Sequence, residues 1–224
     1  MPARDIVEEM NEYYRVRAAW HDEYLSYTDS AAMEKLLSPV IAFVEPFVAG
    51  RNVLEIACGT GNWTQALARR ARSVVATDIN GSMVAIARSK PYAGGAVSFL
   101  LDDAYGLTAV RDGFTAAFAA DWWSHVPISR LRPFLKLLHS KLAPGSNVVF
   151  VDMLERDHPD LTPYRRDEDG NLIHRRRLPN GREFDVLKNF PSREDVLTGL
   201  DGLGREPVYW EDLDLMRWSV AYRT

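Results

Sequence analysis

The sequence lacks the features that mark several classes of protein. A single cysteine, Cys58, among 224 residues excludes an intramolecular disulfide and any metal site built from several cysteines. Lysine and arginine (27) are outnumbered by aspartate and glutamate (31), so no strong positive field gathers nucleic acid. The apolar run at 40–48 is broken by Glu45-Pro46 and is far too short to span a membrane. The polar, acidic start does not resemble a signal peptide, so we expect a soluble cytoplasmic protein without membrane contacts.

What the sequence contains is an alternation of short apolar runs and helical segments. Hydrophobic residues make up 46% and charged residues 26%, which are globular proportions, and the length suits one sizeable domain. Apolar runs predict strands over 52–57, 73–78, 96–101, 114–120 and 147–153, and helices over 62–70, 82–88 and 130–142 lie between them. Such alternation predicts an α/β fold with a mostly parallel, Rossmann-like sheet that helices cover on both faces.

Segments on either side of this core predict additional parts. Helices are expected over 5–20 and from an N-cap at Asp29-Ser30 to Gly50, where Pro39 and Pro46 favour a kink or a break. After the polar segment, a helix over 192–200 and strands over 206–210 and 213–222 would complete the sheet. The predicted parts are an N-terminal helical lid (1–50), a core (51–153), an inserted flap (154–190) and a C-terminal completion of the core (191–224).

The flap is predicted to be a β-hairpin, because Asn180-Gly181 lies between two extended runs. A three-residue loop that pairs Leu178 with Arg182 is favoured, because Gly181 then occupies the left-handed bulge position. A two-residue loop would instead place Arg176 beside acidic residues of the returning strand. In the favoured register, one face carries Arg176, Phe184, Val186 and Lys188.

A glycine loop over residues 55–61 (Glu-Ile-Ala-Cys-Gly-Thr-Gly) is the most informative stretch. Here a strand ends, the backbone turns tightly and a helix begins, which brings backbone N–H groups close to a polar ligand. Asp78 ends the next strand, 17 residues after Gly61, and suits an acid that binds ribose hydroxyls. A dinucleotide loop would have a glycine in place of Thr64, and the Glu55 carboxylate would repel a diphosphate. A sulfonium ligand with an amino-acid tail meets both conditions.

These residues resemble motif I of the class I S-adenosylmethionine (SAM) methyltransferases. The resemblance implies a seven-stranded sheet with an antiparallel last strand, SAM as cofactor and S-adenosylhomocysteine (SAH) as product. A helix with the pattern Y-Y-x-x-R-A implies that Tyr14 and Arg17 lie near the SAM carboxylate, although an aromatic stripe packed on the sheet is an equal alternative for the tyrosines. The cofactor contacts that the resemblance implies are Tyr14, Arg17, Glu55, Ala57, Gly59, Gly61, Trp63, Asp78, Asp103 and Asp121.

A more specific resemblance concerns the methyl acceptor. The same helix, the Trp122-x-x-His125-Val126-Pro127 segment and the arginine-rich flap resemble a set of bacterial O-methyltransferases with small acidic acceptors. That set includes the phosphonate O-methyltransferase of dehydrophos biosynthesis, and it resembles fatty-acid O-methyltransferases. The residues that it implies for the acceptor site are Tyr27, Trp123, His125, Arg176 and Lys188.

Several alternatives stay open from the residues alone. His125 is expected at the site as a general base, an anion-binding imidazole or a packed residue. A hydroxyl, phenol or nitrogen acceptor would need it as base, whereas a carboxylic acid is already ionised at neutral pH. The flap arginines form either an anion clamp or a solvated face paired with neighbouring acids. We expect no metal, and a small-molecule acid rather than nucleic acid as substrate of a monomer or homodimer.

Overall fold

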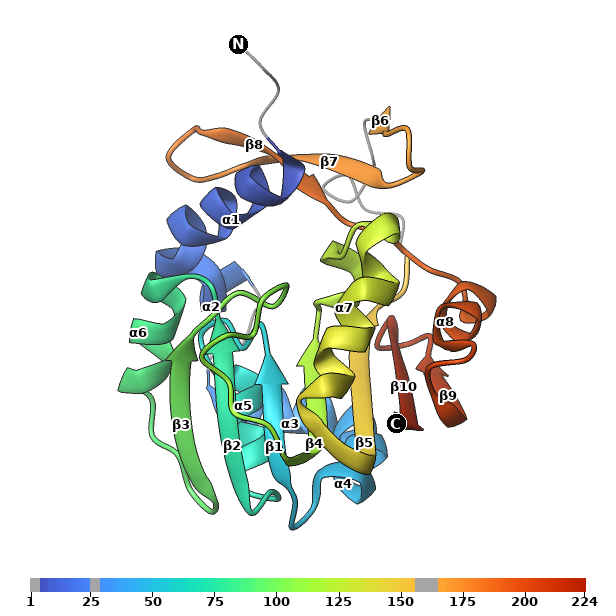
Figure 1. Cartoon of the computed structure of the whole chain (residues 1–224). Helices are drawn as coiled ribbons and strands as arrows, with labels where there is room; N and C mark the ends of the chain where they lie inside the picture. Colours follow the sequence, from blue (N-terminus) through green and yellow to red (C-terminus); the bar gives the residue numbers. More distant parts are fainter. Residues whose placement is uncertain (1–4, 25–28, 156–164) are drawn as a thin grey trace.

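The computed structural model describes residues 5–24, 29–155 and 165–224. Within them, seven strands form one sheet in the order β3-β2-β1-β4-β5-β10-β9 (Figure 1). Neighbours from β3 to β5 are parallel, and β10 is antiparallel to both β5 and β9, which confirms the predicted mostly parallel sheet. The strands are β1 (Asn52–Ile56), β2 (Ser73–Asp78), β3 (Ala96–Leu101), β4 (Phe114–Ala120), β5 (Leu142–Met153), β9 (Arg205–Asp212) and β10 (Arg217–Arg223).

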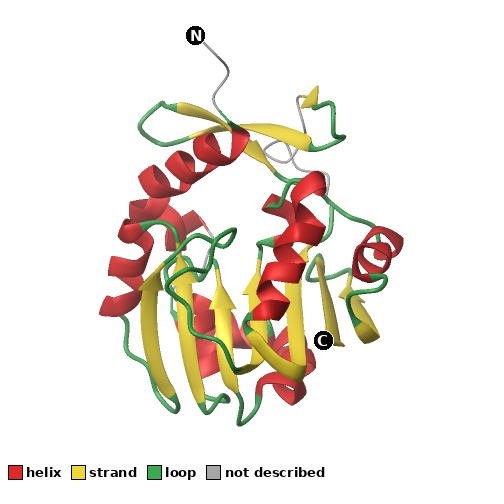
Figure 2. Cartoon of the chain, in the orientation of Figure 1, coloured by secondary structure: helices red, strands yellow, loops and turns green. Residues whose placement is uncertain are grey.

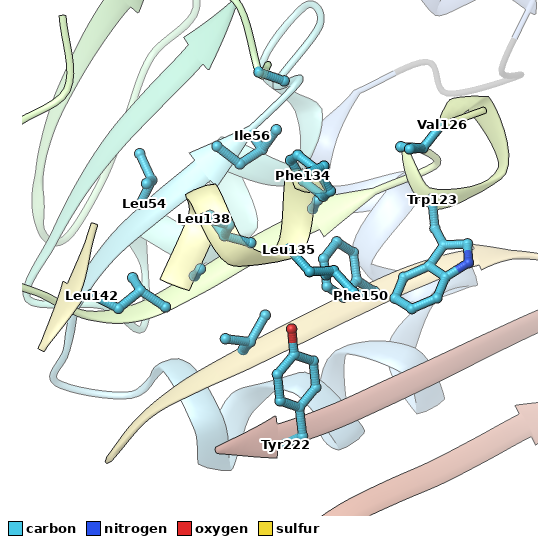
Figure 3. Close-up of a cluster of buried hydrophobic side chains, with 14 of the residues drawn as sticks. Leu54, Ile56, Trp123, Val126, Phe134, Leu135, Leu138, Leu142, Phe150 and Tyr222 are labelled. Carbon is cyan, nitrogen blue, oxygen red and sulfur yellow. The ribbon is translucent and has the colours of Figure 1, made fainter. Parts of the chain in front are cut away.

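Helices cover both faces of this sheet (Figures 1 and 2). On one face, α7 (Ile128–Ser140) packs Phe134 against Phe150 of β5, in the cluster of buried side chains that Figure 3 shows. On the other face lie α3 (Ser30–Leu36), α4 (Ser38–Val48) and α5 (Asn62–Ala68), and their apolar side chains bury the opposite side of β4 and β5. Two further helices are α6 (Gly81–Ser89) and α8 (Arg193–Leu200). Apolar burial on both faces explains why the strands read as continuous hydrophobic runs.

Several boundaries differ from the prediction for local reasons. The first helix is α1 (Ile6–Arg17), followed by a 3-10 turn and the short α2 (His21–Tyr24), instead of one helix to residue 20. The helix expected over 29–50 begins at an Asp29 cap as predicted but breaks at Leu37, because Pro39 fits the first turn of a new helix. The strand expected from 147 begins at Leu142. The last strand begins only at Arg217, because 213–216 form a turn.

The predicted flap is a separate sheet of β6 (Arg165–Arg166), β7 (Leu172–Arg177) and β8 (Glu183–Leu187). The Leu178 N–H donates to the Arg182 carbonyl (2.9 Å), and Gly181 has a φ of 81°. The hairpin therefore has the three-residue loop that the sequence favoured, and Arg176 pairs with Phe184.

The flap and α1 pack together and form what we call the cap, that is, α1 with β7 and β8. Met10 and Tyr13 of α1 belong to one buried cluster with Phe184 and Val186 of β8. The Glu9 carboxylate accepts a hydrogen bond from the Asp185 backbone N–H (2.8 Å). Figure 1 places the cap across the carboxyl ends of the parallel strands. The cap thus covers the edge of the sheet at which ligands bind in open α/β folds.

Candidate active site

A cavity of about 480 Å³ lies between the cap and the carboxyl ends of the strands. Two non-glycine residues that line it have left-handed backbones, Ala57 after β1 (φ 52°) and Asp121 after β4 (φ 52°). Such conformations are unfavourable for residues with a Cβ and concentrate at functional sites. They mark the carboxyl edges of two adjacent central strands as the floor of the site.

Asp78 at the end of β2 organises the glycine loop from below. Its carboxylate accepts hydrogen bonds from the backbone N–H groups of Gly59 (2.9 Å) and Asn80 (2.8 Å), and it lines the cavity. An ionised carboxylate accepts about four hydrogen bonds, so capacity is left for ligand hydroxyls. Asp103, which follows β3, also lines the cavity, and its backbone is held by the buried Asp102 carboxylate (2.9 Å).

The two loop glycines have different roles. Gly59 (φ 55°) lines the cavity, whereas Gly61 (φ 82°) precedes α5 and is absent from the described lining. A Cβ on Gly61 would collide with the Tyr92 hydroxyl, so glycine is needed there for the turn and its close packing. Trp63, in the first turn of α5, lines the cavity and packs against Phe118.

Glu55 does not occupy the position that the sequence suggested. It is only 1% exposed, lies beneath the loop and does not line the cavity. Burial raises its pKa to about 8, and the nearby Asp78 charge adds to the effect. The carboxyl group is therefore protonated at neutral pH and supplies no charge to attract a cationic ligand. Direct contact between Glu55 and the ligand stays a prediction, and here the central strand points this side chain into the interior.

This burial makes a prediction for stability. The pKa of Glu55 is higher in the folded than in the unfolded chain, so the folded state binds more protons between about pH 4.5 and 8, and stability falls as pH rises through that window. We expect Glu55→Gln to raise the free energy of unfolding at pH 8.5 by a few kcal/mol (about 1.4 kcal/mol for each pKa unit) and to change it little at pH 4.5. Urea titrations at both pH values measure this. An equal effect at both would contradict the buried, protonated state.

Tyr14 and His125 form a direct contact above the floor of the site. The Tyr14 hydroxyl lies 2.8 Å from His125 Nε2, and His125 Nδ1 lies 2.6 Å from the Leu187 carbonyl oxygen. Both side chains line the cavity, and burial, followed by the charge of Lys188, holds the pKa of His125 well below its usual value. His125 is therefore neutral at pH 7. Arg17 is buried beside this pair, with its guanidinium 5.7 Å from the centre of the Tyr14 ring.

The end of the cavity next to His125 is rich in cations. Arg176 of β7 and Lys188, which directly follows β8, both line it, as their predicted face requires. Lys188 is almost fully buried, and its ammonium group donates to Ser124 Oγ (2.7 Å) and to the Asp152 carboxylate (3.1 Å). The ion pair therefore holds the Lys188 ammonium group in a fixed position. Arg176 of the flap is a half-buried cation at the same end of the cavity.

Arg217 is a further cation at this end, and the sequence reasoning missed it. It begins β10, lines the cavity and forms an ion pair with Asp121. Burial would raise the pKa of Asp121, but Arg217 and Lys188 outweigh it and hold that pKa below its usual value. The sequence reasoning also missed Asp152. A charged residue within the apolar end of a strand is a signal that could have identified it.

One predicted acceptor residue, Trp123, is not part of the cavity lining that the structure describes, and another cannot be placed. Trp123 is buried in the core, where it packs against Phe150 (Figure 3) and against Trp218. Its neighbour Trp122 lines the cavity instead. The short 3-10 turn after β4 directs the two tryptophans to different places. Tyr27 lies outside the described residues.

Most other flap arginines pair with acids. Arg165 and Arg175 contact Asp185, and Arg182 contacts Glu12 of α1. For these residues the solvated-face interpretation holds, and these pairs join strands of the flap or tie the flap to α1.

Within the described part of the chain, every helix is too short or too polar to traverse a lipid bilayer.

Comparisons with known proteins find similar methyltransferases. A family model described as a methyltransferase domain matches residues 53–145, and one described as tRNA (uracil-5-)-methyltransferase matches residues 4–93. None of the curated proteins matches the sequence significantly. Among solved structures, the DhpI–SAH complex is 29% identical over 99% of this chain and 98% of that chain, with a TM-score of 0.77.

Two further structures extend this likeness. DhpI in complex with SAM and HEP is 26% identical, with all of both chains covered and a TM-score of 0.78. The N-methyltransferase NodS from Bradyrhizobium japonicum WM9, in complex with SAH, shares the fold at 17% identity, with 96% and 98% covered and a TM-score of 0.62. The sheet, the cavity and these matches identify the chain as a class I SAM-dependent methyltransferase, an enzyme whose cofactor is SAM. Within this class it resembles DhpI over its full length.

Proposed function

We propose that this enzyme transfers the methyl group of SAM to an oxygen of a small anionic acceptor, either a carboxylate or a phosphonate. The observation that carries the proposal is the charge at the acceptor end of the cavity. Three cations, Arg176, Lys188 and Arg217, line it, and the carboxylates of Asp152 and Asp121 hold Lys188 and Arg217 in place. Arginine suits such acids, because its planar guanidinium matches their geometry.

The cofactor fits the opposite end of the cavity. Asp78 retains capacity for ribose hydroxyls, Asp103 lies where the adenine is expected, and Gly59 allows close approach of the backbone. When bound, SAM supplies an activated methyl group on a positively charged sulfur. The protein then has to align acceptor and methyl group and exclude water, which the cap over the strand ends favours.

The state of His125 favours an acid over a hydroxyl acceptor. A hydroxyl would need a base, but the Nε2 atom already faces the Tyr14 hydroxyl and the ring has a strongly lowered pKa. An acid with a pKa near 4 is ionised at neutral pH and needs no base. Arg176 would orient the anion, while tight binding of its charge would slow the reaction, since that charge disappears in the transition state.

The match to the tRNA methyltransferase model does not favour a nucleic-acid acceptor. It ends at residue 93, before β4, β5 and the flap, and so covers the cofactor half of the site rather than the acceptor half. The net charge of −4 also opposes binding of a polyanion. The test is a panel of labelled-SAM assays with fatty acids, phosphonates, phenols and tRNA. Turnover of acids supports the proposal, and turnover confined to phenols or tRNA refutes it.

The pH dependence tests whether His125 acts as a base that titrates in the working range. Because the pKa of His125 is well below 6.5, we expect kcat for an acid acceptor to be flat from pH 6 to 9. Stopped-time assays with saturating acceptor measure this, with His125→Gln as the matched variant. A rise in rate between pH 6 and 8 that disappears in His125→Gln would show that the histidine acts as a base and would contradict the acid acceptor.

A further inference from the structure

Lys188 is held by its backbone as well as by its ammonium group. It directly follows β8, and its backbone N–H donates to the Leu172 carbonyl (3.0 Å). Its own carbonyl accepts a hydrogen bond from His174 Nε2 (2.9 Å). The N–H of the next residue, Asn189, donates to the Ser124 carbonyl (2.7 Å). The main chain at Lys188 is therefore fixed both to β7 and to the 3-10 turn after β4.

The Asp152 carboxylate behind Lys188 has used its capacity for hydrogen bonds. It is fully buried and accepts from the backbone N–H groups of Ser124 (2.9 Å) and Met153 (2.8 Å). It also accepts from the Ser124 hydroxyl (3.0 Å) and from Lys188 (3.1 Å), and about four hydrogen bonds are what an ionised carboxylate can accept. Neither Asp152 nor Ser124 belongs to the cavity lining that the structure describes. Asp152 therefore reaches the cavity through Lys188 rather than by direct contact.

The hydrogen positions in this cluster follow from chemistry. An ammonium group can only donate, so Ser124 Oγ accepts from Lys188 (2.7 Å) and gives its one hydrogen to Asp152. Of the three ammonium hydrogens, one goes to Ser124 and one to Asp152. The described residues provide no oxygen acceptor for the third, and the centre of the Phe190 ring, 5.9 Å from Nζ, is at the limit of a cation–π contact. Since Lys188 lines the cavity, this hydrogen is available to a ligand there.

We propose that Asp152, together with Ser124, positions Lys188 so that its third N–H binds the acidic group of the methyl acceptor. Asp152 and Ser124 are then positioning residues, and Lys188 is the residue that contacts the acceptor. A lysine side chain has many rotamers, and ordering it on binding lowers affinity, whereas here folding has already ordered it. The inference rests on the proposed anionic acceptor and adds to it the two residues that prepare this cation for binding.

The first test is Asp152→Asn, which removes the ion pair and keeps the size of the side chain. We expect KM for an acidic acceptor to rise about tenfold, because the ammonium group loses its fixed position, while SAM affinity stays within twofold. Steady-state assays measure KM, calorimetry measures SAM affinity, and the melting temperature reports on folding. A folded Asp152→Asn protein with the KM of the wild type would overturn the proposal.

The chain offers a matched control in a second pair of serine and aspartate. The Asp195 carboxylate accepts from the backbone N–H (2.9 Å) and the hydroxyl (2.7 Å) of Ser192 at the start of α8, as Asp152 does from Ser124. This pair has no lysine partner among the described residues and is absent from the described cavity lining. Asp195→Asn should therefore leave both KM and SAM affinity unchanged.

A second comparison asks whether Asp152 acts through Lys188. Lys188→Gln removes the charge but keeps N–H donors for Asp152, so the buried carboxylate retains a partner. In this background, Asp152→Asn should cause no further rise in KM, because no ammonium group remains to be positioned. A merely structural role predicts the same factor with and without the lysine, and that result would refute the positioning role.

Ser124→Ala keeps the proposal testable if Asp152→Asn does not fold. It leaves the ion pair and removes one of the two anchors of the ammonium group, so we expect KM to rise about threefold at unchanged SAM affinity. An unchanged KM in folded Ser124→Ala would overturn the proposal. Failure of the proposed function gives a different result, because the wild type itself would then not methylate acids.

Discussion

Replacing Asp78 with alanine is expected to weaken SAM binding about 100-fold, because one carboxylate has two tasks. It accepts hydrogen bonds from the backbone N–H groups of Gly59 and Asn80, and so sets the shape of the glycine loop. It also offers its remaining lone pairs to the ribose hydroxyls in a nearly buried position. Hydrogen bonds to charged groups contribute about 1.5–3 kcal/mol each, so the loss of ribose contacts and loop order together gives an effect of this size.

Calorimetry with SAM measures the effect, and the melting temperature reports on folding. Asp112→Ala is a suitable control, because this exposed carboxylate contacts only Lys141 in the described structure and is remote from the cavity lining. It should leave SAM affinity unchanged. An Asp78→Ala protein that is folded and binds SAM as tightly as the wild type would show that the cofactor lies elsewhere.

Replacing Arg176 with methionine is expected to raise KM for an acidic acceptor about 50-fold while SAM affinity is maintained. Methionine keeps most of the length and apolar character of the side chain but removes the guanidinium, so the effect reports on the charge-assisted hydrogen bonds to the anion. Arg176 is better suited to this test than Lys188. Removal of Lys188 would leave Asp152, which is fully buried, without its partner, and that loss costs about 3–5 kcal/mol of stability.

The hairpin provides the matched control for this experiment. Arg177 is the next residue on β7, points to the other face and is exposed, so Arg177→Met removes the same charge from the flap without altering the cavity. We expect a normal KM for Arg177→Met. If both variants raise KM equally, the general charge of the flap attracts the acceptor, and if neither does, the anion site is not at Arg176.

Much of this architecture could be predicted from local sequence. The alternation of apolar runs with helical segments predicted the order of core strands and helices. This was possible because strands that are buried on both faces of a parallel sheet are continuous apolar runs in the sequence. The hairpin register was predicted from a single residue, Gly181, because few other residues adopt its left-handed conformation easily. Asp78 was found by its spacing from the glycine loop, and the structure places it under that loop.

The side-chain partners within the site could not be predicted in this way. Tyr14 and His125 are 111 positions apart, and Lys188 and Asp152 are 36 apart, so the packing of the cap on the sheet decides that they meet. Arg217 and Asp121 come together only because β10 inserts antiparallel beside β5.

The sequence by itself determined the α/β class, the glycine loop and the hairpin, because these depend on backbone conformations and on periodic burial that neighbouring residues impose. Only the tertiary structure decided which groups carry charge in the cavity and beneath its floor. Burial neutralises Glu55 and His125, and the Asp152 pair offsets the charge of Lys188. Protonation and pairing depend on solvent exclusion and on distant partners, and no stretch of sequence contains that information.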